Sequence, residues 1–472
     1  MDNNALKLTL QDLNLAGREI PVPVNVFLED GSYITIEKVL RVLPGKRLVA
    51  KAQWHKKPVL AKIFFQKGKP GSAAKKENRG YNAIKKVGIV TPERLSVIRE
   101  KQAQLFLYDF ISEGESLYNM LEKTTSPAEH SNLLRMVVLA TVSLHENGLL
   151  QEDLHFDNFM YWLGELYVID VASITSPENH QPLSQSTSIE NLALLWAQLP
   201  PSEQSLAQAY FTLYCAKRNW LANESLRTQF DCAITTAWEK RKNHYLQKQF
   251  RECTENIRLK NFAEEIIFKR KFKSTGFEDL LKNPDMFLAK GEMLKDGNSA
   301  TVVKIDIDNQ PFVIKRYNNK NFLKAFTRLF KKSRAERCWY FAHLLGFIDL
   351  QTPAPVAVIV NRFGPFRLNS YFISEYHEGS TLQKVWSKNE PNLDIVESIV
   401  TIFMQLKANR IVHGDCKSTN FLVKGGDVCL IDLDSMQDKQ DTGFKNDIQR
   451  FLKDWQQKPE LLAYLKKQLK VE

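Results

Sequence analysis

Three polar side chains near the C-terminal end are spaced as a phosphotransfer site requires. Asp415 is followed five residues later by Asn420, and a short apolar run then leads to Asp432. A carboxylate such as Asp415 can accept the proton of an attacking hydroxyl, whereas the amide of Asn420 and the carboxylate of Asp432 are oxygen ligands suited to Mg²⁺. Two short strands joined by a turn at 424–427 would bring the three groups together.

The same pattern occurs earlier in the chain. Asp153, Asn158 and Asp170 repeat both intervals, five residues and then twelve. A duplicated set with fixed internal spacing is hard to obtain by chance. The sequence therefore predicts two kinase-like domains in tandem.

Length and composition agree with two soluble domains. The chain has 472 residues, which is longer than a single domain with one hydrophobic core usually is. Of these residues, 43% are hydrophobic and 25% are charged, as in soluble globular proteins. No apolar run reaches the roughly 20 residues that span a bilayer, and the first residues do not resemble a signal peptide. We expect a cytoplasmic protein. The 6 cysteines form no C-x-x-C pair, so we expect reduced thiols and no zinc site.

The net charge of +11 is locally concentrated, at 269–273 and from 315 to 334. A basic protein can bind nucleic acid, an anionic membrane or a polyanionic small substrate, although a single charge run is usually solvated surface. We expect neither a nucleic acid nor a protein partner. The basic segment 320–334 also carries phenylalanines at helical spacing, so it could touch an anionic membrane or pack on its own domain.

Upstream of each Asp–Asn–Asp set, a strand ends on a lysine and a helix carries a glutamate. These pairs are Lys62 with Glu77 and Lys315 with Glu336. In a kinase fold the strand lysine binds nucleotide phosphates and the helix carboxylate orients it. The small polar loop Gly297, Asn298 and Ser299 could also lie over phosphates, with its N–H groups facing the anion.

The order of these segments predicts the domain plan. We expect a lead-in at 1–30, a first kinase-like domain at 31–270 and a second at 285–472. Each domain is α+β, with a β-rich N-lobe and a mainly helical C-lobe. Apolar residues at helical spacing make the stretch from 171 to about 267 mainly helical in this prediction.

Several segments resemble the lipopolysaccharide core kinases, the bacterial heptose and Kdo kinases that have a protein-kinase-like fold. The resembling residues of the first half are Arg41–Arg47, Lys62, Glu77, the loop Asp153–Asn158 and Asp170, and the run His244–Thr254 also resembles the two-domain members. Those of the second half are Lys295–Thr301, Val313–Asn318, Ser333–Arg337, His413–Asp415 and Ile431–Asp434. The resemblance implies ATP as the donor, Mg²⁺ as the metal, and an inner-core sugar hydroxyl on a lipid-linked saccharide as the acceptor. It also implies that the protein acts at the cytoplasmic face of the bacterial inner membrane.

The resemblance assigns roles to the candidate residues. Asp415 and Asp153 would orient the attacking hydroxyl as bases. The metal ligands would be Asn420 with Asp432 and Asn158 with Asp170, and the phosphates would be held by Lys315 with Glu336 and Lys62 with Glu77. Positioning and charge neutralisation would supply most of the acceleration.

The sequence departs from protein kinases in two places. Gln151 and Glu152 precede Asp153 where a histidine and a basic or small residue are usual, and neither Asp170 nor Asp432 begins an Asp-Phe-Gly motif. Only 40 residues follow Asp432, which leaves little room for an activation segment and favours a saccharide acceptor over a protein.

Two alternatives remain at this point. The first domain could be a pseudokinase that binds core saccharide or scaffolds the second, as Gln151 and Glu152 indicate. The chain could also be a protein Ser/Thr kinase or an antibiotic phosphotransferase, because His-Gly-Asp occurs in aminoglycoside kinases and fold analogy does not fix the acceptor.

Overall fold

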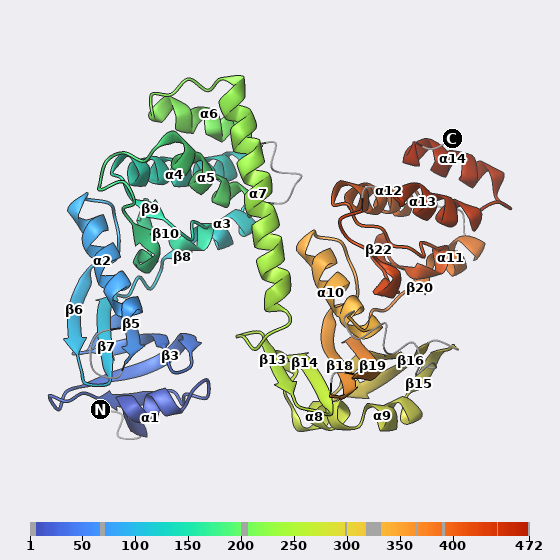
Figure 1. Ribbon diagram of the computed structural model, residues 1–472, viewed down its shortest axis with the longest axis horizontal. Coiled ribbons are helices and arrows are strands. Elements are labelled where there is room, and N and C mark those ends of the chain that lie inside the picture. The colour runs from blue at the N-terminus through green and yellow to red at the C-terminus, as the bar shows by residue number, and fades with distance from the viewer. Residues whose placement is uncertain are drawn as a thin grey trace. The chain divides into compact units, whose positions relative to one another are not determined.

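The computed structural model describes residues 6–66, 71–199, 206–297, 300–317, 332–364, 366–388, 392–440 and 442–470. The chain divides into two compact units, Met1–Glu239 and Lys240–Glu472. In each unit a seven-stranded sheet comes first and a mainly helical lobe follows (Figure 1). This confirms the predicted α+β class.

The first unit opens with a sheet in the order β1-β2-β3-β4-β5-β7-β6. Its strands are β1 (Leu6–Thr9), β2 (Val24–Phe27), β3 (Tyr33–Leu43), β4 (Arg47–Trp54), β5 (Lys57–Phe65), β6 (Arg94–Arg99) and β7 (Ala103–Asp109). Helix α1 (Leu10–Leu15) connects β1 to β2, and α2 (Ser72–Lys86) follows β5. The expected lead-in at 1–30 thus adds two strands to the edge of this sheet beside β3.

The helical lobe of the first unit surrounds a small hairpin that bears the catalytic candidates. The hairpin is β10 (Phe159–Trp162) and β11 (Glu165–Val168), with β8 (Glu115–Ser116) beside β10. The shorter strands β9 (Leu150–Gln151) and β12 (Ile174–Thr175) pair nearby. The helices are α3 (Leu117–Lys123), α4 (Pro127–Glu146), α5 (Gln185–Trp196), α6 (Ala207–Lys217) and the part of α7 (Glu224–Lys248) up to Glu239.

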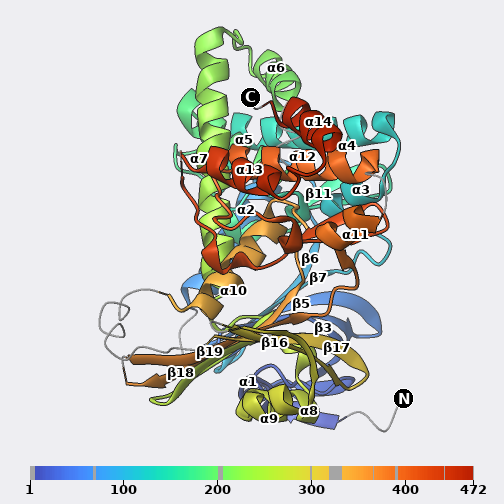
Figure 2. The same ribbon diagram turned by 90° about the vertical axis from the view of Figure 1, so that its right-hand side faces the viewer.

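The second unit repeats this plan (Figure 2). Its sheet has the order β13-β14-β18-β19-β17-β16-β15. The strands are β13 (Asn256–Lys260), β14 (Glu264–Lys269), β15 (Glu292–Asp296), β16 (Ala300–Ile307), β17 (Gln310–Tyr317), β18 (Pro355–Phe363) and β19 (Phe366–Glu375). With this sheet come α8 (Thr275–Lys282), α9 (Pro284–Lys290) and α10 (Arg334–Phe347).

The helical lobe of the second unit also holds a hairpin. It consists of β21 (Phe421–Lys424) and β22 (Asp427–Leu430), with β20 (Ser380–Thr381) beside β21. The helices are α11 (Leu382–Lys388), α12 (Leu393–Ala408), α13 (Phe444–Lys453) and α14 (Pro459–Leu469).

The two sheets share a five-strand core and differ at their edges. The order β3-β4-β5-β7-β6 in the first sheet corresponds to β15-β16-β17-β19-β18 in the second. The extra pair lies beside β3 in the first sheet, whereas in the second it is β13 and β14, beside β18. We expected a mainly helical chain up to about residue 267, so the β13–β14 hairpin is a correction. Its turn forms because Asn261 Oδ1 accepts main-chain hydrogen bonds from Ala263 and Glu264.

The β13–β14 hairpin also places the boundary between the units earlier in the chain than we expected. The structure divides the chain after Glu239, whereas the expected boundary lay between 270 and 285. The reason is that β14 pairs with β18, so 256–269 builds the second sheet instead of closing the first domain.

An amphipathic helix leads into each catalytic loop. In α4, Ser126 caps the first turn, and in α12 Asn392 does the same. Both helices bury apolar side chains at helical spacing. These are Leu133, Leu134, Val137 and Val138 in α4, and Ile395, Val396, Ile399, Ile402, Phe403 and Leu406 in α12.

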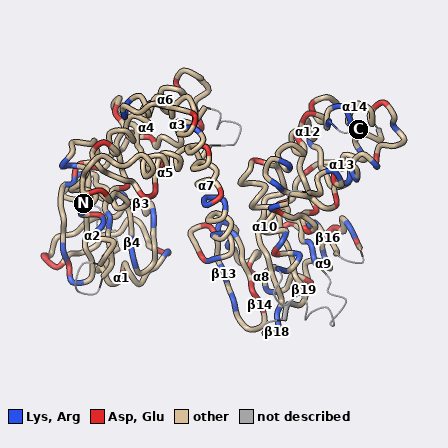
Figure 3. Tube along the Cα trace, turned by 45° about the horizontal axis from the view of Figure 1, so that its top comes forward, with Lys and Arg blue, Asp and Glu red and all other residues tan. Residues whose placement is uncertain are grey.

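Basic and acidic residues are interspersed along the Cα trace of each unit (Figure 3). Among the described residues, no helix is long and apolar enough to cross a membrane. Most of the basic segment 320–334, which we considered for membrane contact, lies outside the described residues, as 318–331 are not among them.

Candidate active site

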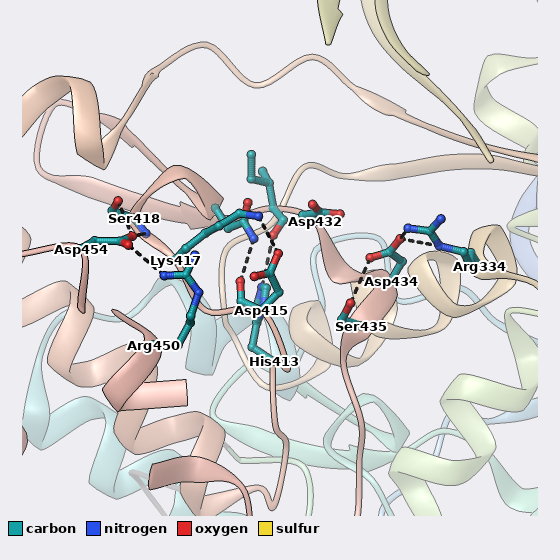
Figure 4. A network of polar contacts seen from close by, with 12 residues as sticks. Arg334, His413, Asp415, Lys417, Ser418, Asp432, Asp434, Ser435, Arg450 and Asp454 are labelled. Carbon is teal, nitrogen blue, oxygen red and sulfur yellow. Dashed lines mark hydrogen bonds and ion pairs between the residues drawn. The ribbon is translucent and has the colours of Figure 1, made fainter. Parts of the chain in front are cut away.

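The hairpin of the second unit brings together the three residues with which the sequence pattern began. Asn420 immediately precedes β21, and its side-chain amide donates to the main-chain oxygen of Asp415 at 2.8 Å. The N–H of Ile431 donates to the main-chain oxygen of Asn420 at 2.9 Å. Asp432 follows Ile431 directly, and it lies near Asp415 in the same group of polar side chains (Figure 4).

Asp432 has an unusual backbone and a cationic partner. Its φ is 64°, in the left-handed region that non-glycine residues seldom adopt. Its carboxylate forms an ion pair with Lys315, which β17 supplies. Burial raises the pKa of the Asp432 carboxyl, but Lys315 outweighs this effect and the net pKa is lowered. Asp432 is therefore ionised at neutral pH, as a metal ligand must be.

Lys417 lies beside the candidate base and was missed by sequence reasoning. Its ammonium donates to Asp415 Oδ2 at 2.7 Å, and the Asp415 side chain is 35% exposed. The spacing of two residues between an acid and a lysine in the catalytic loop could have drawn attention to it. A cation at this place neutralises charge beside the carboxylate.

Two carboxylates that the sequence analysis did not single out hold the catalytic loop. Asp447, in α13, accepts the N–H groups of His413 at 2.6 Å and Gly414 at 2.9 Å. Asp454, at the C-terminal end of α13, accepts both the N–H and the hydroxyl of Ser418 at 2.7 Å. Hydrogen bonds to a charged acceptor are stronger than neutral ones, so α13 fixes the loop on both sides of Asp415. Figure 4 shows the contact between Asp454 and Ser418.

The helix α10 does not place Glu336 as expected. Glu336 closes a capping box with Ser333 at the start of α10, while Lys315 pairs with Asp432. The α10 side chain on the lysine's side is Cys338. Its sulfur lies 2.9 Å from the Tyr317 hydroxyl, and the Tyr317 ring centroid is 5.0 Å from Lys315 Nζ.

Helix α10 also contacts the segment that follows Asp432. Arg334 forms an ion pair with the buried carboxylate of Asp434 (Figure 4). Of the predicted phosphate loop, Gly297 donates its N–H to the Ala300 oxygen at 3.1 Å. Asn298 and Ser299 lie outside the described residues.

In the first unit the predicted lysine–glutamate pair forms. Lys62 Nζ lies 2.8 Å from Glu77 Oε1, and both side chains are buried. The hydroxyl of Tyr108 donates to the same oxygen at 2.7 Å. Lys62 also donates to the main-chain oxygen of Ile169, at 3.4 Å. Strand β5, helix α2 and the segment before Asp170 therefore meet at this lysine.

The catalytic loop of the first unit has the same backbone but weaker supports. The Asn158 amide donates to the Asp153 oxygen at 2.6 Å, and Ile169 N–H donates to the Asn158 oxygen at 2.9 Å. However, the Asp153 side chain is 78% exposed. Asp170 has φ −103°, unlike Asp432, and its main-chain oxygen accepts from the side chain of Gln151.

Amides stand in the first unit where the second has carboxylates. Asn191 and Gln198 are seven residues apart, as Asp447 and Asp454 are, and they contact the corresponding loop positions. Asn191 donates to the Gln151 oxygen at 2.9 Å, and Gln198 accepts the Phe156 N–H at 3.1 Å. The first unit thus has the lysine–glutamate pair but, among its described residues, no carboxylates that hold its catalytic loop. The second unit has these carboxylates, Asp447 and Asp454, but its lysine pairs with Asp432 instead of a glutamate.

The donor set of the second unit fits Mg²⁺ and a nucleotide. The metal usually takes one or two carboxylates together with phosphate oxygens and water. Because the amide nitrogen of Asn420 is engaged with Asp415, its oxygen is turned to the opposite side and can coordinate together with Asp432. The described residues hold no group of three His, Cys, Asp or Glu side chains that could bind a metal alone.

Comparisons with known proteins agree with this geometry only in part of the chain. The search of curated proteins finds no match. Among solved structures, the chain is similar to the "Crystal structure of BubR1 kinase domain", with 13% identity and a TM-score of 0.32, covering 46% of this chain and 86% of that one. Residues 295–461 match the model of the Lipopolysaccharide kinase (Kdo/WaaP) family. This stretch of the second unit is therefore similar to the Kdo/WaaP lipopolysaccharide kinases.

Proposed function

We propose that the chain is an ATP-dependent kinase that phosphorylates a sugar hydroxyl of the lipopolysaccharide inner core, and that the reaction takes place in the second unit. The observation that supports this most directly is the convergence of Asp415, Asn420 and Asp432 with Lys315. The family match covers the same residues.

Each residue has a defined task in this mechanism. Asp415 accepts a hydrogen bond from the acceptor hydroxyl and orients its oxygen. It takes the proton as the new oxygen–phosphorus bond forms and the bond from the γ-phosphorus to the leaving ADP oxygen breaks. Lys417 neutralises charge beside this carboxylate. Lys315 exchanges its contact with Asp432 for the phosphates of the donor. Asn420 and Asp432 would hold Mg²⁺, which when bound neutralises phosphate charge.

The acceptor is a lipid-linked saccharide in this proposal, so the protein acts at the anionic inner face of the inner membrane. Helices α13 and α14 follow Asp432 in the chain. Both helices belong to the support of the catalytic loop and the lobe core.

The test is phosphate transfer from ATP to dephosphorylated core saccharide in the presence of Mg²⁺. Wild-type protein should release ADP and label the acceptor, and Asp415→Asn should lose at least about 100-fold of this rate. Asp153→Asn is the matched variant and should change the rate less than about twofold. Equal rates for wild type and Asp415→Asn would refute the proposed site.

A second candidate role concerns the first unit, which we propose is a non-catalytic partner. The exposed Asp153 and the amides Asn191 and Gln198 favour this role, because the loop is not held by charged acceptors. Nucleotide-induced thermal shifts of Lys62→Ala and Lys315→Ala separate the two units. If Lys62→Ala abolishes turnover as Lys315→Ala does, the first unit is catalytic after all.

A further inference from the structure

Each unit has a cavity at the same place in its fold, away from the catalytic candidates. In the first unit it measures about 580 Å³, and in the second about 490 Å³. Both lie among the turn after helix α2 or α10, the end of strand β7 or β19, and the hairpin β10–β11 or β21–β22. The cavity of the first unit has a different lining from its counterpart.

Equivalent contacts establish that the two places correspond. Thr91 donates to the Val168 oxygen at 2.7 Å, and Thr352 donates to the Leu430 oxygen at 2.8 Å. In each case the acceptor lies two residues before the metal-site aspartate. By this register Tyr167 corresponds to Cys429, since each follows its catalytic aspartate by fourteen residues.

The same register shows what is particular to the first unit. Trp162 and Tyr167 both line its cavity, but the matching positions in the second unit are Lys424 and Cys429. The second unit builds its hairpin with the same pairing and without these rings. The fold therefore does not require the two aromatic side chains, and a binding role accounts for them.

The lining combines ring faces with charged groups. The ring centroids of Trp162 and Tyr167 are 5.8 Å apart, and both side chains are only half-buried. Lys57 and Asp109 are exposed at the margin, where Glu93 forms a 2.7 Å ion pair with Lys85. Aromatic faces pack against the C–H face of a sugar ring, and carboxylates and ammonium groups bond its hydroxyls.

We propose that this cavity of the first unit binds a sugar residue of the acceptor saccharide. The identity of the saccharide rests on the proposed function. The cavity is lined by neither Lys62 nor Glu77 nor Asp170, so saccharide binding there is independent of nucleotide. The first unit then has a use for its kinase-like fold without catalysis.

The experiment titrates full-length protein, without ATP, with the oligosaccharide of dephosphorylated lipopolysaccharide core freed from its lipid. Isothermal calorimetry compares wild type with Trp162→Lys/Tyr167→Cys, which reproduces the second unit's residues. The double variant should raise Kd about tenfold or more. Trp162→Phe/Tyr167→Phe retains rings and should stay within about threefold of wild type. Tyr33→Cys, which removes an exposed ring elsewhere in the first unit, should bind as wild type.

Thermal unfolding of each variant shows that the first unit is folded. If the double variant unfolds, Tyr167→Cys alone gives the same comparison, with a rise in Kd of about threefold or more. Wild-type-like binding by a folded Tyr167→Cys or double variant would overturn the proposal, and so would the absence of binding by wild type.

The phosphate-transfer assay separates this inference from the proposed function. Phosphate transfer without ring-dependent saccharide binding would refute the proposed binding in the cavity but would still support the proposed kinase function. Ring-dependent binding without transfer would support the cavity and refute the kinase reaction.

Discussion

Asp447 and Asp454 lie seven residues apart and hold the main chain on either side of Asp415. Seven residues are two turns of helix, so both carboxylates leave α13 on the same face. The catalytic loop lies across this face. The second unit therefore positions its candidate base through a helix that follows it in the chain.

Replacing these carboxylates with the amides of the first unit should impair catalysis. Asp447→Asn turns an N–H donor toward one of the two loop N–H groups that the carboxylate accepts. Asp454→Gln removes the charged acceptor of Ser418. We expect kcat to fall about 10- to 100-fold, because small displacements of a base are costly, with KM for ATP nearly unchanged. Asn191→Asp and Gln198→Glu in the first unit are the controls and should leave kcat unchanged. An unaltered kcat in Asp447→Asn would contradict the anchoring role.

The buried pair Lys62–Glu77 should show the energetics of an ion pair removed from water. Glu77→Leu leaves Lys62 buried without its carboxylate and should destabilise the first unit by about 3–5 kcal/mol. Lys62→Met/Glu77→Leu removes both charges and should cost less than the single change. Urea unfolding of the full chain measures both. A double variant that is less stable than Glu77→Leu would show that the charge is not what makes the single change costly.

The local part of the site could be predicted from the sequence. The intervals from Asp415 to Asn420 and Asp432 recur because one hydrogen bond closes the loop within five residues and a four-residue strand pair follows. The lobes also followed from strand and helix periodicity. Contacts between residues close in sequence produce spacing patterns that can be recognised in the sequence itself.

The partner of Lys315 could not be predicted in this way. Glu336 is the first carboxylate after Lys315 in the sequence. However, two residues on a helix are about 200° apart, and the face toward the lysine carries Cys338. The distance to the next Thr-Pro pair could have shown that Cys338, and not Glu336, corresponds to Glu77. Glu77 lies fourteen residues before Thr91, and Cys338 lies fourteen residues before Thr352. Asp447 has no local signature either, since its partners lie 34 and 33 residues away.

Gly80 fixes how closely α2 approaches the segment after Asp170. A Cβ added there would overlap the main-chain oxygen of Val171. Gly80→Ala should therefore destabilise the first unit by about 1–3 kcal/mol. Gly346→Ala in α10 is the matched control, since nothing lies within 4 Å of its Cβ position, and it should be neutral or stabilise by up to about 1 kcal/mol. Equal effects at both positions in thermal unfolding would argue against the close approach.

His145 should make the stability of the first unit depend on pH. Its ring is buried between the Tyr214 hydroxyl at 2.7 Å and Asn191 Oδ1 at 3.0 Å, and burial lowers its pKa to about 4. Because the unfolded chain takes up the proton near pH 6.5, the folded state loses stability as the pH falls from about 6.5 to about 4. The loss attributable to this group is about 3 kcal/mol. Urea unfolding at several pH values should show a steeper decline for wild type than for His145→Gln, and parallel declines would show that His145 takes up its proton equally in both states.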